Sequence, residues 1–168
     1  MNTTKAIAAQ AQAIQQTETA LIELFVRLAQ VIGLQRSIGE IYGLLFAAVR
    51  PLTMDELTQR LGISKGSASQ GLRLLRSFGA VRMEYVPGDR RDHYVAELEL
   101  RHLLGGFLRE KLQPHLVWGA GQLNEIDRLV AALPGDDQGL LRQRLIRLKR
   151  WRTRGQKMLP MMLKLLRV

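Results

Sequence analysis

One continuous stretch, residues 53–95, decides the fold: TMDELTQRLGISKGSASQGLRLLRSFGAVRMEYVPGDRRDHYV. Thr53 is followed three residues later by Glu56, the spacing of a capping box, in which each residue bonds the backbone amide of the other. Gly62 supplies a left-handed residue that ends this first short helix, and Ser64 is placed to cap a second helix. Two short capped helices joined by a glycine turn predict a bihelical unit of the helix-turn-helix kind.

The second helix of this unit, residues 65–78, has two chemically different faces. An inward stripe is expected from its apolar residues, namely Ala68, Leu72 and Leu75, widened by Leu74 and Phe78. The outward face carries short hydroxyls, an amide and cations, namely Lys65, Gly66, Ser67, Ser69, Gln70, Arg73 and Arg76. Such groups can donate to phosphates or contact base edges. A solvated polar face on a packing helix is the alternative, and periodicity alone hardly separates the two.

Two glycines lie inside the same helix. Gly66 and Gly71 each cost a helix about 1 kcal/mol relative to alanine. This cost predicts that the helix backbone closely approaches another surface.

A hairpin follows the second helix. Residues 81–86 and 93–95 have strand composition, and residues 87–91 between them form a turn that places Arg90 and Arg91 side by side. A hairpin directly after such a helix is a wing, and its arginines are placed to enter a minor groove or hold phosphates. A hydrated loop is the alternative.

Helices are predicted on both sides of the motif. A long helix over residues 5–32 ends at Gly33, and a helix over 37–49 begins with Ser37 as cap and Glu40 completing a capping box. Pro114 kinks or divides the helical run over 97–133, and a last helix over 138–166 is interrupted or bent near Gly155 and Pro160.

The expected fold class is therefore mainly α with a small β-hairpin wing. A winged helix-turn-helix over residues 51–97 lies between N-terminal helices (1–50) and C-terminal helices (98–168). Apolar stripes predict that the first and last helices form a dimer interface. They comprise Ile14, Leu21, Phe25, Leu28 and Ile32, and Leu141, Leu145, Leu148, Leu159, Met162 and Leu166.

The net charge of +10 does not bear on the motif. Residues 1–137 hold 15 basic and 15 acidic side chains, whereas residues 138–168 hold ten basic ones and no acid. The basic last helix is interpreted first as a structural helix with incidental phosphate contact. Contact with flanking DNA is a further interpretation, and an anionic membrane surface is the least favoured.

Several classes of site are not expected. The chain has no cysteine, and its three histidines lie far apart, so no metal site is predicted. No nucleophile triad or phosphate-binding loop stands out, which argues against an enzyme and against a cofactor. We expect a cytoplasmic protein without a membrane segment, because neither a secretory signal nor a spanning apolar run is present.

Residues 53–97 resemble the GbsR branch of the MarR-type winged helix-turn-helix regulators. The resemblance lies in LGISKGSAS (61–69), LRLLRSFGAV (72–81) and VPGDRRDHY (86–94). It implies a transcriptional regulator, by default a repressor, that binds double-stranded DNA as a homodimer on a pseudo-palindromic operator. The DNA-binding positions it implies are Ser64, Lys65, Ser67, Ser69, Gln70 and Arg73 on the helix and Arg90 and Arg91 on the wing. The alternative is a dimeric winged-helix adaptor that binds proteins without specific DNA binding.

The resemblance also implies a small-molecule effector, choline-like or another osmolyte. A quaternary ammonium is bound by aromatic faces. The candidates for such a site are Tyr42, Phe46, Phe107 and Trp118, and Phe25 is a further aromatic candidate. Aromatic residues at helical spacing are otherwise core residues.

Overall fold

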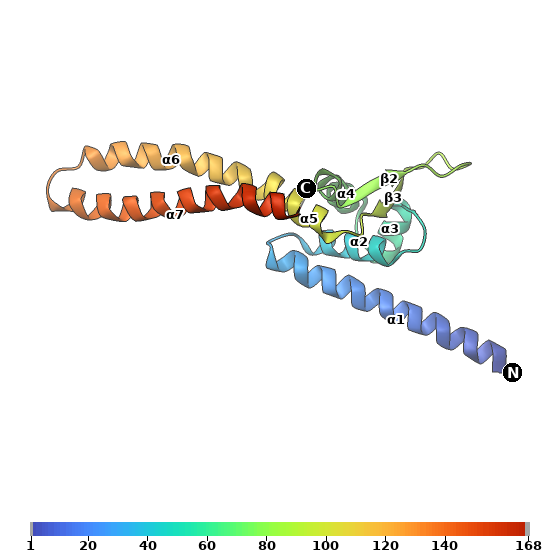
Figure 1. Cartoon of the computed structure of the whole chain (residues 1–168). Coiled ribbons are helices and arrows are strands. Elements are labelled where there is room, and N and C mark those ends of the chain that lie inside the picture. The colour runs from blue at the N-terminus through green and yellow to red at the C-terminus, as the bar shows by residue number, and fades with distance from the viewer. Residues whose placement is uncertain (1, 167–168) are drawn as a thin grey trace. The chain divides into compact units, whose positions relative to one another are not determined.

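Helices make up most of the computed structural model, which describes the backbone of residues 2–166 and the side chains of residues 9–135 and 137–166 (Figure 1). The chain forms two compact units, Met1–Leu103 and Leu104–Val168. Residues 1–50 therefore belong to the same unit as the winged motif. The expected fold class, mainly α with a small winged motif, is confirmed.

The N-terminal unit contains four helices and a small antiparallel sheet among its described residues. The helices are α1 (Asn2–Val31), α2 (Arg36–Ala47), α3 (Met54–Leu61) and α4 (Lys65–Ser77). The strands are β1 (Leu52–Thr53), β2 (Val81–Glu84) and β3 (His93–Ala96), in the order β1-β3-β2. Tyr94 of the central strand is paired with Leu52 on one side and Met83 on the other. Strand β1 was not predicted, because two residues are too few to show an alternating pattern.

Helix α2 is the centre of this unit, packing against α1, α3, α4 and β3. Ile41 and Leu44 on α2 are fully buried. Gly39 and Gly43 lie where α1 crosses: a Cβ atom at Gly39 would come within 2.6 Å of the Phe25 carbonyl oxygen, and one at Gly43 within 2.7 Å of the Ile22 Cα. The two helices therefore pack backbone to backbone at these positions, which only glycine permits.

The start of α2 differs from the prediction. The helix begins at Arg36 after Gln35, which makes no side-chain capping bond, so the capping box proposed for Ser37 and Glu40 is wrong. Glu40 instead accepts a hydrogen bond from the Arg36 Nε at 2.6 Å, an i,i+4 pair on the helix surface. A carboxylate three residues after a serine is thus also satisfied by an arginine one turn before it.

The C-terminal unit is dominated by an antiparallel helix pair. Helix α5 (Leu100–Phe107) passes through a π-helical turn (Leu108–Leu112) into α6 (Gln113–Ala131), which packs against α7 (Asp136–Leu166). The loop between α6 and α7 is short (Figure 1). Pro114 lies in the first turn of α6, where the missing amide costs no helical hydrogen bond. The run over 97–133 is not divided at this proline, because the backbone is helical without a break from Leu100 to Ala131; the π-helical turn lies just before Pro114.

The predicted interruption of the last helix is wrong. Helix α7 continues through Gly155 and Pro160 to Leu166. Leu145 and Leu159 are buried on either side of Gly155, and Leu145 packs with Leu123 and Val130 of α6. Tertiary packing thus offsets the propensity cost of the two residues.

The apolar stripes are only partly available to another chain. Phe25 of α1 is buried against α2 and Leu145 of α7 is buried against α6, whereas Ile14, Leu28 and Leu148 are exposed. Dimerisation through these helices stays a prediction. Within residues 2–166, no helical segment combines the length and hydropathy that crossing a bilayer requires.

Candidate nucleic-acid interface

The turn that positions the candidate interface is built by the capping box of α3. The Thr53 Oγ1 accepts from the Glu56 amide at 3.3 Å, and the Glu56 Oε2 accepts from the Thr53 amide at 2.8 Å. Gly62 ends the helix with a φ of +65°. Arg50 reaches the Glu56 carboxylate at 2.5 Å. The predicted caps of this helix are confirmed.

The hydrogen bonds to the Glu56 carboxylate, first from Arg50 and then from the Thr53 amide, lower the pKa of Glu56 to about 2. Because this pKa is depressed in the folded state, its contribution to stability is present above the ordinary value of 4.5 and is lost as the pH falls towards 2. We expect the Glu56→Gln variant to be less stable than the wild type by about 1–2 kcal/mol at pH 7. The difference should shrink between pH 4.5 and 2.

The measurement is urea unfolding at a series of pH values, followed by the near-ultraviolet circular dichroism of tyrosine. All three tyrosines lie in the N-terminal unit and both tryptophans in the C-terminal unit, so the two signals separate the units. Glu23→Gln, at an exposed position of α1, is the matched control. A difference between wild type and Glu56→Gln that stays constant down to pH 2 would contradict the assigned capping role.

Helix α4 presents the predicted polar face to solvent. Ser64 caps the helix, its Oγ accepting from the Ser67 amide at 3.2 Å. The inward residues Ala68, Leu72 and Leu75 are buried, as predicted. The candidate DNA contacts Ser64, Lys65, Gln70 and Arg73 are exposed, and Ser67 and Ser69 are half-buried. One face of α4 therefore anchors the helix and the other is open.

Lys65 is the one candidate on α4 for which the described residues show an ion pair. Its Nζ lies 2.9 Å from Asp55 of α3, with both side chains largely exposed. An exposed pair of this kind contributes little to stability and exchanges readily for a phosphate.

The two glycines of α4 differ in what lies beside them. A Cβ atom at Gly71 would come within 2.5 Å of the Ile41 Cδ1 on α2, so the close approach is to the protein's own core. Gly66 is exposed, and the nearest atom to a Cβ there would be the Ser64 Oγ at 3.9 Å. The predicted close approach to another surface is confirmed at Gly71, where that surface is α2, whereas at Gly66 no atom of the described residues comes that close.

The wing is held by a network around Asp89. The Asp89 carboxylate accepts from the Nε of Arg91 at 2.9 Å, from its Nη2 at 2.5 Å and from its backbone amide at 3.0 Å. These bonds hold the pKa of Asp89 well below its usual range and raise the pKa of Arg91. The Nδ1 of the buried His93 ring lies 2.8 Å from the Arg91 carbonyl oxygen. Its Nε2 lies 3.4 Å from the Asp89 carboxylate.

The two wing arginines are therefore not equivalent. Arg91 is bonded within the wing, whereas Arg90 is exposed and makes no hydrogen bond or ion pair with the described residues of the chain. The sequence suggested two equivalent cations. It could not show the Asp89 contacts, because these depend on how the turn folds.

A shallow groove beside α4 adds one cation, Arg82, that the sequence alone did not assign to the site. It is lined by the end of α4 and by β2, with Arg73, Arg76 and Arg82 as its charged residues. Arg82 donates a hydrogen bond to the Glu84 carboxylate at 2.8 Å, on the same face of β2. Successive residues of a strand point to opposite faces, so the buried Val81 implies that Arg82 faces solvent. This alternation is the sequence signal that could have assigned Arg82 to the site.

The aromatic candidates for an effector site are divided between the two units. Tyr42 lies in the core of the N-terminal unit, edge-on to Phe25 with 4.8 Å between the ring centroids. The centroid of the Phe46 ring lies 6.0 Å from that of Tyr42. Burial raises the pKa of Tyr42 to about 12, and its hydroxyl donates to the Glu97 carbonyl oxygen at 2.6 Å. Phe107 and Trp118 lie in the C-terminal unit, Trp118 exposed on α6. The effector site stays a prediction, and Tyr42 serves as a core residue.

Residues 9–135 and 137–166 contain no grouping of three or more histidine or acidic side chains placed to hold a metal ion. No cofactor-binding residues follow from this arrangement. The chemistry that the open surface of α4 and the wing offers is hydrogen-bond donation and positive charge.

Similar known proteins are found by sequence and by structure, although no protein-family model matches the chain. The HTH-type transcriptional repressor GbsR of Bacillus subtilis is 28% identical over 99 residues, which are 59% of this chain and 54% of that protein. The putative HTH-type transcriptional regulator YvaV and the HTH-type transcriptional repressor OpcR of the same organism are each 27% identical over 84 residues, 50% of this chain. These segments are 48% and 45% of the two proteins. The chain thus spans about half the length of the curated relatives it matches.

A solved structure described as that of a transcriptional regulator superposes with a TM-score of 0.65 at 20% identity, covering 89% of this chain and 95% of the other. At this identity the likeness concerns the fold, which extends beyond the winged motif into the flanking helices. None of these relatives carries an enzyme's name. The resemblance inferred from residues 53–97 is confirmed: the chain is similar to GbsR-like helix-turn-helix regulators.

Proposed function

We propose that the chain is a transcriptional regulator that binds double-stranded DNA through α4 and the wing. The observation that carries the proposal is the open face of α4. No large apolar side chain of this helix is exposed, and its open face, apart from Gly66, carries hydroxyls, an amide and cations. A helix that docks on a protein would present apolar or aromatic anchors there, so this face favours DNA over the adaptor alternative.

In this proposal α4 enters the major groove. Its first turn and a half, from Ser64 to Gln70, brings donors and acceptors towards base edges, and Arg73 can bond a guanine or a phosphate. The wing lies over the adjacent backbone or minor groove, where negative potential is concentrated. Arg76 and Arg82 in the neighbouring groove add phosphate contacts.

We further propose that the protein acts as a homodimer on a pseudo-palindromic operator and represses transcription. Two observations support self-association: a single helix-turn-helix offers few base contacts, and α7 exposes large apolar side chains near its end. Met161 and Leu165 are 75% and 83% exposed. Two of the similar proteins are named repressors.

The deciding experiment is selection of binding sites from random duplex DNA with the full chain, combined with sedimentation of the protein and of its complex. The expected result is an enriched motif with two-fold symmetry, bound by a dimer. Failure to enrich any sequence would contradict a specific regulator, and a stable monomer at micromolar concentration would contradict the dimer.

The wing provides a test within the proposal. Because Arg90 has no ion pair with the described residues and Arg91 is bonded to Asp89, Arg90→Ala should remove one phosphate contact. The slope of log affinity against log salt should then fall by about 0.9. Arg90→Ala should weaken binding to all sequences similarly. Arg91→Ala should change this slope less, and salt-dependent fluorescence anisotropy measures both variants. Equal slope losses would show that the Asp89 contact does not persist on DNA.

A further inference from the structure

Helix α7 carries a concentration of positive charge that the winged motif does not use. Between residues 138 and 166 it holds no acidic side chain. Its described cations are Arg142, Arg144, Arg147, Lys149, Arg150, Arg152, Arg154, Lys157 and Lys164. The sequence alone does not show which of them are held by α6.

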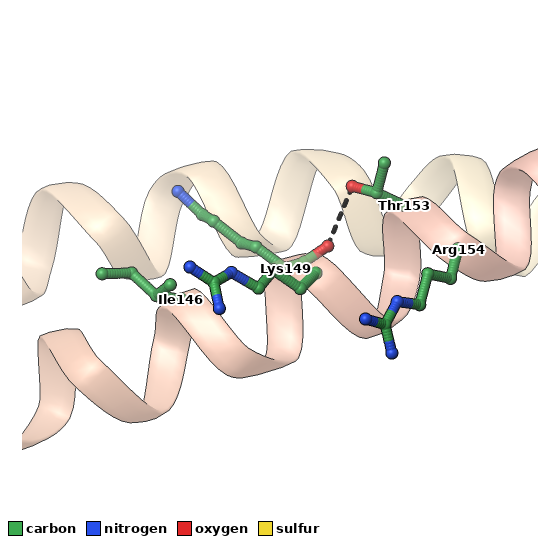
Figure 2. A pocket seen from close by; sticks show the side chains of 5 residues that line it. Ile146, Lys149, Thr153 and Arg154 are labelled. Carbon is green, nitrogen blue, oxygen red and sulfur yellow. Dashed lines mark hydrogen bonds between the residues drawn. The ribbon is translucent and has the colours of Figure 1, made fainter.

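The structure separates inward from outward cations. Lys149 is only partly exposed and reaches across to Asp127 of α6, with its Nζ 2.7 Å from the carboxylate, whereas Arg154 points away from α6 (Figure 2). Arg152 is also partly covered, with its Nε out of contact with solvent. These two side chains belong to the face that packs in the helix pair.

Four cations lie together on the outward face. Arg147, Arg150, Arg154 and Lys157 are exposed and follow the spacing i, i+3, i+7, i+10, which places them on one side of a helix over about 15 Å. We call these four residues the basic stripe. The described residues show no ion pair to any of the four. A shallow depression lined by Ile146, Lys149, Arg150, Thr153 and Arg154 adjoins the stripe (Figure 2).

Like charges at this spacing repel one another. Surface helices usually interleave acids that relieve this repulsion, and residues 138–166 of α7 contain none. A polyanion would supply the missing countercharge and would gain further from the release of its own counterions.

We propose that the basic stripe binds the phosphate backbone of double-stranded DNA as a contact surface separate from α4 and the wing. This inference rests on the proposed DNA-binding function. A membrane surface is the other polyanion that the test addresses, because a helix that lies on a bilayer inserts its apolar face. Alongside the stripe that face is used within the chain only in part, since Leu145 is buried with Leu123 and Val130 of α6, whereas Trp151 and Met158 are exposed. DNA is favoured because it is already the partner of the proposed function.

The test replaces Arg147, Arg150 and Arg154 with glutamine, which removes three charges and keeps a good helix former. The matched control replaces Arg109, Lys111 and Arg128 with glutamine, an equal charge change at exposed positions of the same unit. Binding of the full chain to duplex DNA is measured from low to high salt. At about 0.9 per phosphate contact, the stripe variant should lose about 2.7 from the salt slope. The control should lose much less, and the preference for specific over random DNA should be unchanged.

Four results would overturn the inference. Equal slopes for wild type and stripe variant would show that the stripe does not contact DNA, while leaving the proposed function intact. A changed oligomeric state by sedimentation, or lost binding to phosphatidylserine-containing vesicles with an unchanged DNA slope, would assign the stripe to assembly or to a membrane. A wild type that binds no DNA at any salt concentration would overturn the proposed function together with this inference.

Discussion

The Gly39→Ala variant is expected to lose about 3 kcal/mol or more of the free energy of unfolding of the N-terminal unit. The added methyl group would come within 2.6 Å of the Phe25 carbonyl oxygen and of the Val26 Cα. Both atoms are backbone, so no side-chain rotation can make room and α1 must move away from α2. That movement would open the core around Phe25 and Tyr42, which is the expected source of the large effect.

Two other glycines calibrate this expectation. A methyl group at Gly71 would meet the Cδ1 of Ile41, the flexible end of a side chain, so Gly71→Ala should cost less than Gly39→Ala. Gly66→Ala, with no neighbour closer than 3.9 Å, should be neutral or stabilising by up to about 1 kcal/mol. Urea unfolding followed by tyrosine circular dichroism ranks the three variants. If Gly39→Ala were as stable as Gly66→Ala, the backbone contact between α1 and α2 would be refuted.

The second large effect is expected from Arg73→Ala on DNA binding. Arg73 is exposed on the outer face of α4 and also lines the groove shared with β2, so it is central to the proposed interface. A good arginine contact to a base contributes about 1–3 kcal/mol of discrimination. We therefore expect specific affinity to fall roughly tenfold to a hundredfold. Affinity for random duplex should fall much less.

Arg27→Ala is the matched control, since it removes the same charge from an exposed position on α1 outside the interface. Fluorescence anisotropy with the selected site and with a scrambled duplex gives the specificity ratio of each variant. An unchanged ratio for Arg73→Ala would mean that this residue contacts only phosphate. Equal losses for Arg73→Ala and Arg27→Ala would place the DNA elsewhere on the protein.

The winged motif could be predicted because its signals are local. Each cap involves residues at most three positions apart, as with Thr53 and Glu56, and a left-handed glycine such as Gly62 is needed wherever a turn leaves a helix in this way. The inward and outward faces of α4 follow from its 3.6-residue period. The same logic failed at Ser37, where an equally good local pattern competes with the Arg36–Glu40 pair.

The amino-acid sequence by itself thus determined the motif, the two faces of α4 and the resemblance to known regulators. The tertiary structure alone decided what Gly39, Gly43 and Gly71 pack against, because each contact joins residues distant in the chain. It also decided that Arg91 is bonded to Asp89 while Arg90 has no partner among the described residues, and which cations of α7 face outward. The physical reason is the same throughout: helix periods and caps act over a few residues, whereas close packing and charge pairing depend on which surfaces the fold brings together.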